Sequence, residues 1–337
     1  MNHVAVDLAS RQSQFCVRIE GGDVSREGRV STPLLGELFV SLEKSRIVLE
    51  ACAEAFAVAD MALKAGHDVT VVPATLAPSL GVGHRGVKTD KRDAQTLSLA
   101  SCRMGSLPSV HIPSMQAREL RALMASREVQ VKMRTMLVNH VRGWLRTQLM
   151  HVRSGSTSTF PARVREVALA RPAGLPQHIE RNLQLIEDVS AQIAAADKEL
   201  EHLVEGDSVC QRLMTVPGVG PVTAATFRST VDDCSRFKSA HALESYVGLT
   251  PSEHSSGETV RRGRITRAGS GRVRASLVQA AWTAWRTRPE DSMVKWSRAL
   301  AERRPKQVAA VALARKMAGI LFAIWRDAST YNPAHQR

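Results

Sequence analysis

The chain has 337 residues, which is enough to bury a substantial core in two or three domains. Its formal net charge of +14 predicts an acidic partner, either nucleic acid or an anionic membrane. Five scattered cysteines and eleven histidines without metal-ligand spacing argue against a disulfide framework or a zinc site, and predict a reduced, cytoplasmic protein. The first residues lack a basic region followed by an apolar run, so no secretory signal is expected.

Residues 1–110 are predicted to form an α/β domain of the ribonuclease-H type. Three short strands come first, within 3–9, 13–19 and 28–32, separated by the turn-forming residues 20–23. Helices and strands then alternate: a helix in 33–44, a strand in 46–51, a helix in 53–66 and a strand in 68–73. A glycine-rich loop precedes one further helix, which begins near residue 90.

Four acids lie where this fold would bring them together. Asp7 ends the first strand, Glu50 ends the fourth, and Asp90 and Asp93 share one face of the late helix. Strand ends on one edge of an α/β sheet point into a common crevice, and four carboxylates there would repel unless cations neutralised them. The pattern predicts a site for two Mg²⁺ or Mn²⁺ ions that clamp a phosphodiester.

Simpler interpretations of these acids remain open. Asp7 or Glu50 alone could be an ordinary acid at a strand end, and Asp90 with Asp93 could favour a helix dipole at a solvated helix start. Actin-like sugar kinases also begin with a strand that ends in Asp. They need further phosphate-binding loops, and the sequence shows no convincing one.

Residues 111–205 are predicted to form a helical, coiled-coil-like arm. One long helical pattern runs from 114 to about 151, and a second has apolar residues near heptad spacing between 179 and 203. Two long helices in succession suggest an antiparallel arm. Its apolar stripe is either core or a subunit contact in a homo-oligomer, and its basic residues favour nucleic acid. The apolar stretch 308–325 is interrupted by Arg315 and Lys316, so a packed helix is expected there and not a membrane span.

Residues 206–337 are predicted to form a mostly helical domain with a basic surface. The Pro-Gly-Val-Gly turn at 217–220 indicates a helix-hairpin-helix element whose amides approach a phosphate, or a plain glycine-rich connection. Between Thr259 and Pro289 there are eight arginines and no acid, a density typical of a phosphate-binding surface. Glycines at 257, 263, 269 and 271 predict a mobile loop. The candidate DNA-binding residues are Arg261, Arg262, Arg264, Arg267, Arg272 and Arg274.

The chain resembles the DEDD-type insertion-sequence transposases, relatives of the Piv invertases, some described as bridge-RNA-guided recombinases. The resemblance rests on "AVDLAS", "VLEACAEAF", "KTDKRDA", "TVPGVGPVTA", "YVGLTP" and "SSGETVRRGRITRAGSGRVRASL", and it covers nearly the whole chain. It implies a RuvC-like domain with Asp7, Glu50, Asp90 and Asp93 as metal ligands. It also implies a serine nucleophile that links covalently to DNA, and a structured guide RNA as a partner.

The nucleophile of this family matches Ser256, the serine directly before a glycine, and Ser255 is its rival. One departure is Phe56, where the family usually has Tyr, so this chain has no aromatic hydroxyl at that position. Two other classes of function stay open. A hydrolytic RuvC-like nuclease needs the four acids but no serine, and a non-catalytic nucleic-acid-binding protein needs only the basic surface.

Overall fold

The computed structural model describes residues 1–337 except 83–88, 171, 173, 254, 257–260 and 335–337. The chain divides into two compact units, Met1–Pro113 and Ser114–Arg337.

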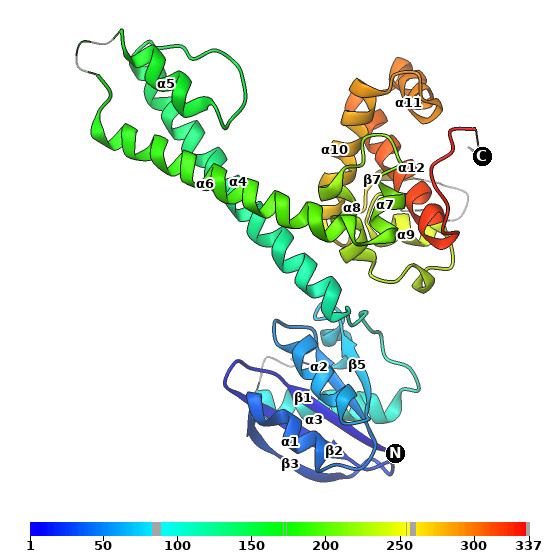
Figure 1. The fold of residues 1–337 in the computed structure, drawn as a ribbon. Coiled ribbons are helices and arrows are strands. Elements are labelled where there is room, and N and C mark those ends of the chain that lie inside the picture. The colour runs from blue at the N-terminus through cyan, green and yellow to red at the C-terminus, as the bar shows by residue number, and fades with distance from the viewer. Residues whose placement is uncertain (83–88, 171, 173, 254, 257–260, 335–337) are drawn as a thin grey trace. The chain divides into compact units, whose positions relative to one another are not determined.

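The first unit is built on one five-stranded mixed sheet (Figure 1). The strands lie in the order β3-β2-β1-β4-β5, with antiparallel pairs β1–β2 and β2–β3 and parallel pairs β1–β4 and β4–β5. The predicted meander of three strands followed by alternating helices and strands is therefore confirmed. The strand bounds are β1 Asn2–Asp7, β2 Gln12–Arg18, β3 Val24–Ser31, β4 Ser45–Glu50 and β5 Asp68–Val72.

Helices cover both faces of this sheet, so its central strands are apolar on both sides. Successive strand side chains point to opposite faces. Val4 and Val6 pack with α1 (Leu35–Val40) and α2 (Ala55–Lys64), whereas Ala5 and Val48 pack with Leu97 of α3 (Asp90–Arg103). Short 3₁₀ turns at Thr32–Leu34 and Ala77–Leu80 complete the unit.

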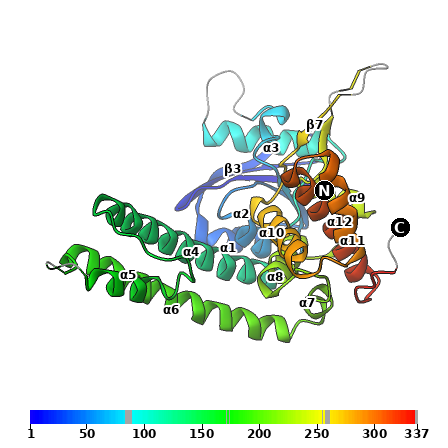
Figure 2. The same ribbon diagram turned by 90° about the horizontal axis from the view of Figure 1, so that it is seen from above.

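The second unit begins with a long antiparallel helix pair (Figure 1 and Figure 2). α4 (Met115–Thr147) and α6 (Gln177–Glu205) lie side by side, and the short α5 (Phe160–Ala168) packs near the end of α4. The arm has an apolar cluster of its own, which confirms the predicted antiparallel pair. That cluster contains Val138, Val141, Leu145, Phe160, Val164, Ile179, Leu183 and Ile186.

The rest of the second unit is mainly helical around one large core. Its helices are α7 Ser208–Leu213, α8 Pro221–Val231, α9 Ala240–Tyr246, α10 Gly271–Thr287, α11 Ser292–Arg303 and α12 Lys306–Arg326, with a 3₁₀ turn at Cys234–Arg236. A two-stranded hairpin, β6 Pro251–Glu253 and β7 Arg262–Ile265, lies between α9 and α10. Of the expected loop, residues 262–265 form β7, residues 266–270 are irregular, and Gly271 begins α10.

α12 is long and apolar enough to cross a membrane by length and composition alone. In the structure it packs in the core, where Leu313, Met317 and Leu321 are fully buried. The expectation of a packed helix is confirmed. The two long helices of the arm and the later helices belong to one compact unit, Ser114–Arg337. The division into an arm at 111–205 and a separate domain at 206–337 stays a prediction.

Candidate active site and nucleic-acid interface

Asp7 and Glu50 end two neighbouring parallel strands. The β1–β4 register pairs Val6 with Leu49, so the next residues of the two strands are Asp7 and Glu50. Both side chains are partly buried. Strand alternation puts them on the same face as Ala5 and Val48, which is the face that α3 covers.

α3 brings the other two acids to the start of a helix. The Thr89 hydroxyl accepts a hydrogen bond from the Arg92 amide at 3.3 Å and so caps the helix directly before Asp90. Asp93 lies on the packed side and is 5% exposed, whereas Asp90 is exposed and has an ion pair with Arg29 at 3.8 Å. The two acids therefore differ: one lies on the face packed against the sheet, the other at the surface.

These acids match a hard divalent cation by chemistry, because carboxylate oxygens are the ligands that Mg²⁺ and Mn²⁺ prefer. Among the residues that the structure describes, no three Asp, Glu, His or Cys side chains are close enough together to hold a metal ion. The structure thus places Asp7, Glu50 and Asp93 around one face of the sheet without closing a ligand set.

Ser256 and its neighbour lie after β6 and before β7. Both serines are exposed. The Ser255 hydroxyl donates a hydrogen bond to the Glu253 carboxylate at 2.8 Å. Sequence reasoning missed Glu253, although alternation on an extended chain places residues two apart on the same side. His254, Gly257 and Glu258 lie outside the described residues.

The predicted DNA-binding arginines fall into two groups. Arg272 pairs with Glu128 of α4 at 2.7 Å, and Arg274 donates to the carbonyls of Ala268 at 2.6 Å and Gly269 at 3.1 Å. These two hold the unit together. The side chains of Arg261, Arg264 and Arg267 are exposed, and the side chain of Arg262 lies outside the described residues.

Several cations of α4 are likewise used inside the protein. Arg121 is partly buried and donates to the Ser229 carbonyl at 2.7 Å, and burial lowers its pKa. Arg127 pairs with Asp197 of α6 at 2.5 Å, and Arg142 lies 5.4 Å from the centre of the Phe160 ring. Charge counted along the sequence therefore overestimated the basic surface of the arm.

The glycine turn between α7 and α8 packs closely on α10. Gly218 has a φ of 85°, and a Cβ there would lie 2.2 Å from the Ala280 carbonyl oxygen. Gly220, which caps α8, has nothing within 4 Å of an added Cβ. Packing explains Gly218, and Gly220 is the glycine that leaves room for a ligand at the helix start.

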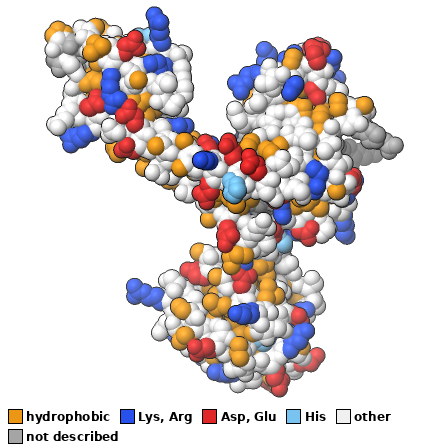
Figure 3. Space-filling model, in the orientation of Figure 1, with side chains coloured by type: hydrophobic (Ala, Val, Ile, Leu, Met, Phe, Trp, Pro, Cys, Tyr) orange, Lys and Arg blue, Asp and Glu red, His pale blue; other side chains and the backbone are white. Residues whose placement is uncertain are grey.

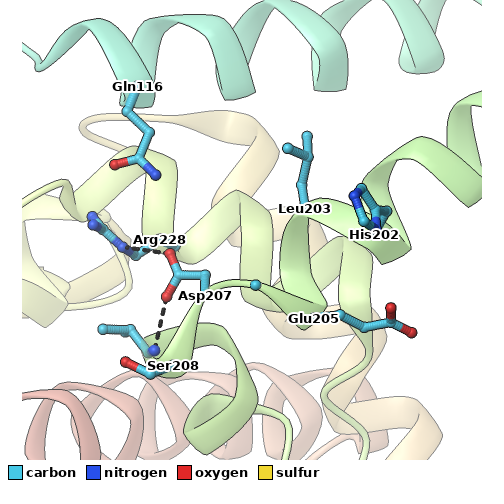
Figure 4. Close-up of a pocket in the computed structure, with 9 residues that line it drawn as sticks. Gln116, His202, Leu203, Glu205, Asp207, Ser208 and Arg228 are labelled. Carbon is cyan, nitrogen blue, oxygen red and sulfur yellow. Dashed lines mark hydrogen bonds and ion pairs between the residues drawn. The ribbon is translucent and has the colours of Figure 1, made fainter.

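A pocket of about 600 Å³, lined by the end of α6, the start of α7 and Arg228 of α8, is unsuited to DNA (Figure 4). Asp207 caps α7 by accepting from the Val209 amide at 2.7 Å, and it pairs with Arg228 of α8 at 3.2 Å. Glu205 adds another acid to the lining. Acidic side chains also gather on this part of the surface, near the end of α6 (Figure 3). Carboxylates there repel phosphate, so the pair Asp207–Arg228 is structural.

Comparison with known proteins gives two family models, and together they reach into both units. Residues 4–149 match a transposase model of the DEDD, IS110 type, and residues 210–294 match the model described as "Transposase IS116/IS110/IS902 family". A probable family 20 transposase of Pseudomonas aeruginosa is 30% identical over 344 aligned positions, covering 99% of both chains. The transposase for insertion sequence element IS1111A of Coxiella burnetii is 29% identical, covering 97% of this chain and 90% of its own.

A relative from Yersinia enterocolitica, the transposase for insertion sequence element IS1328, is 22% identical over 98% of both chains. Similarity thus extends over both units, including the strands with Asp7 and Glu50 and the hairpin beside Ser256. The chain belongs to the IS110 family of DEDD insertion-sequence transposases.

Proposed function

We propose that this transposase cuts and rejoins DNA through a covalent phosphoserine at Ser256, assisted by divalent metal at a RuvC-like acidic site. The metal-binding part of this proposal is supported by one observation. Asp7 and Glu50 lie at the ends of adjacent parallel strands, on the face where α3 buries Asp93. The strand order β3-β2-β1-β4-β5 supports the ribonuclease-H type of fold.

The serine step conserves the number of phosphodiester bonds. The Ser256 oxygen attacks the scissile phosphorus and forms one P–O bond, while the bond to the departing strand end breaks and that end leaves as a hydroxyl. A hydroxyl from another strand then attacks the phosphoserine and regenerates the serine. No external energy source is required, which suits recombination rather than hydrolysis.

Asp7, Glu50, Asp90 and Asp93 would hold Mg²⁺ or Mn²⁺. When bound, such ions stabilise the charge that develops on the attacking and leaving oxygens. The carboxylates themselves provide hard oxygen ligands, and burial of Asp93 restricts its rotation. The acids and Ser256 lie in different units, so this proposal requires the units to act together, within one copy or between copies of a homo-oligomer.

We also propose that the protein acts in the cytoplasm. Besides DNA, it is proposed to bind a structured guide RNA. The net charge of +14 supports binding to more than one polyanion, with affinity falling steeply as salt rises. If purified protein recombined DNA equally well after nuclease had removed all RNA, guidance by RNA would be wrong for this protein.

The test of the main proposal is a protein–DNA adduct that survives denaturation. The full chain is incubated with DNA spanning the ends of its own element and with target DNA, then denatured and digested. We expect a DNA-linked peptide that contains Ser256. Cleaved DNA without any adduct would instead indicate a hydrolytic nuclease. DNA that is bound but not cut would indicate a non-catalytic binding protein.

A further inference from the structure

A second pocket, of about 630 Å³, lies between the β6–β7 hairpin and α12. Its wall is largely apolar, and its polar side chains are the amide of Gln307 and the guanidinium groups of three arginines. Pockets of this size, with few polar groups on an apolar wall, are typical binding sites for ligands of nucleotide size. The lining residues on which the argument rests are Leu249, Arg264, Ile265, Arg267, Val308 and Val311.

The positive charge of this pocket is only partly compensated. Arg315 pairs with Glu244 at 2.6 Å, and the Glu244 side chain is only 14% exposed, so this arginine is neutralised and fixed. Arg264 and Arg267 have no acidic partner in the part of the chain that the structure describes. Among the described residues that line the pocket there is no acid. Two uncompensated guanidinium groups beside an apolar wall favour binding of an anion that also has an apolar surface.

The backbone holds one of these arginines in place. Arg267 has a φ of 57°, a left-handed conformation that is unfavourable for a non-glycine residue. Its amide donates to the Gly248 carbonyl at 3.2 Å, and a Cβ on Gly248 would lie 2.2 Å from the Ala268 carbonyl oxygen. Close packing of two chain segments maintains the strained residue, so the backbone of Arg267 is fixed before any ligand binds.

We propose that this pocket takes one unstacked nucleotide of the DNA beside the Ser256 hairpin. This inference rests on the proposed function, because the strand concerned is the one presented to the serine. A base is flat and apolar on its faces, which suits the wall formed by Leu249, Ile265 and Val311. Arginine binds phosphate through its fork of donors and stacks on bases, which suits Arg264 and Arg267.

Gln307 provides the group that would contact the base edge, because an amide both donates and accepts hydrogen bonds. Taking a base out of the stack is unfavourable, and contacts in the pocket would offset this cost. A base inserted in this pocket would fix the register of the strand relative to the hairpin, so that one phosphate lies at the serine.

The experiment uses photocrosslinking in the full chain with Ser256→Ala, so that its result does not depend on adduct formation. The probe is a single-stranded DNA of the element end that contains 5-iododeoxyuridine at one position per probe. After irradiation and digestion, we expect crosslinks in the peptides with residues 262–267 and 307–312. Val308→Glu should lower their yield at least tenfold, whereas Val308→Gln, of equal size but neutral, should retain it.

Val308 is 49% exposed and lies in the first turn of α12, where a carboxylate is favourable, so the Glu variant should fold. Arg267→Gly is a second variant, because it removes the guanidinium and relieves the left-handed strain. It should keep or raise the melting temperature while reducing the crosslink. Equal crosslinking in Val308→Glu and Val308→Gln would overturn the proposal. Crosslinks that map only to a different pocket, which Trp282 and Trp285 line, would also overturn it. A crosslink without an adduct at Ser256 in the parent chain would overturn the proposed serine chemistry alone.

Discussion

The Ser255 hydroxyl donates to the Glu253 carboxylate across 2.8 Å, so the serine next to the proposed nucleophile already has an acidic partner. A serine with a nearby base is one way to activate a nucleophile. The competing explanation is that this bond only stabilises the hairpin and directs Ser255 away from the DNA. The two explanations give opposite results for the two serines.

We expect Ser256→Ala to abolish the covalent adduct and recombination, and Ser255→Ala to retain a measurable fraction of both. Glu253→Gln should behave like Ser255→Ala, because it weakens the same hydrogen bond without removing a hydroxyl. The measurement is mass spectrometry of protein-linked DNA. An adduct that maps to Ser255, or one that persists in Ser256→Ala, would reverse the assignment.

A second prediction concerns metal binding by the acids. Ligand at about 100 times its Kd stabilises a protein by about 2.7 kcal/mol, so Mn²⁺ should raise the melting temperature of the parent. Asp7→Asn and Asp93→Asn should lose this rise, together with strand cleavage, while DNA binding remains. Glu37→Gln removes an exposed carboxylate of α1 and serves as the control. An unchanged Mn²⁺ response in both Asn variants would contradict a metal site at these residues.

The arginines that contact DNA should differ from those that stabilise the fold in how their substitution changes the salt dependence of DNA binding. Arg264→Ala and Arg267→Ala are expected to reduce the slope of log K against log salt by about 1 each, if each guanidinium contacts one phosphate. Arg274→Ala should instead lower thermal stability, because its donors hold the carbonyls of Ala268 and Gly269. DNA titrations at several salt concentrations, with melting curves for the same variants, distinguish the two effects. A slope change in Arg274→Ala at unchanged stability would place that residue on the DNA.

In the glycine turn before α8, Gly220 serves as a control for substitution of Gly218. Gly218→Ala should destabilise the second unit by about 2–4 kcal/mol, because it combines a left-handed φ with a clash against the α10 backbone. Gly220→Ala has open space around the added methyl group and should cost at most about 1 kcal/mol as a cap substitution. Denaturant unfolding measures both. Equal losses in the two variants would mean that the turn does not pack on α10 as described.

Acid should loosen the end of the helical arm. Arg165 of α5 donates to Glu180 at 2.9 Å and to Glu187 at 3.1 Å, and its hydrogen bond lowers the pKa of Glu187. A lowered carboxyl pKa stabilises the fold above the unfolded value of about 4.3, and this stability is lost as the pH falls through the lower folded value. Because these side chains are about one-third exposed, the effect is small. Hydrogen exchange in α5 should increase below that pH in the parent and depend less on pH in Glu187→Gln.

Much of the fold followed from the sequence because local patterns are informative wherever one face of an element is buried. Alternation in residues 3–9, the short apolar run in 46–51, and apolar spacing along the two long helices are properties of the strands and helices themselves. The same patterns placed Asp7 and Glu50 at strand ends, and the resemblance of "SSGETVRRGRITRAGSGRVRASL" indicated Ser256.

Only the tertiary structure decided how the charges are used. Arg121, Arg127, Arg272 and Arg274 look equivalent to Arg264 and Arg267 in the sequence, yet the first four have partners inside the second unit. The partners Glu128 and Asp197 are distant in sequence, at 144 and 70 residues from Arg272 and Arg127. A side chain's charge is local, but whether it is neutralised depends on which segments the fold brings together, and no periodicity along the chain contains that information.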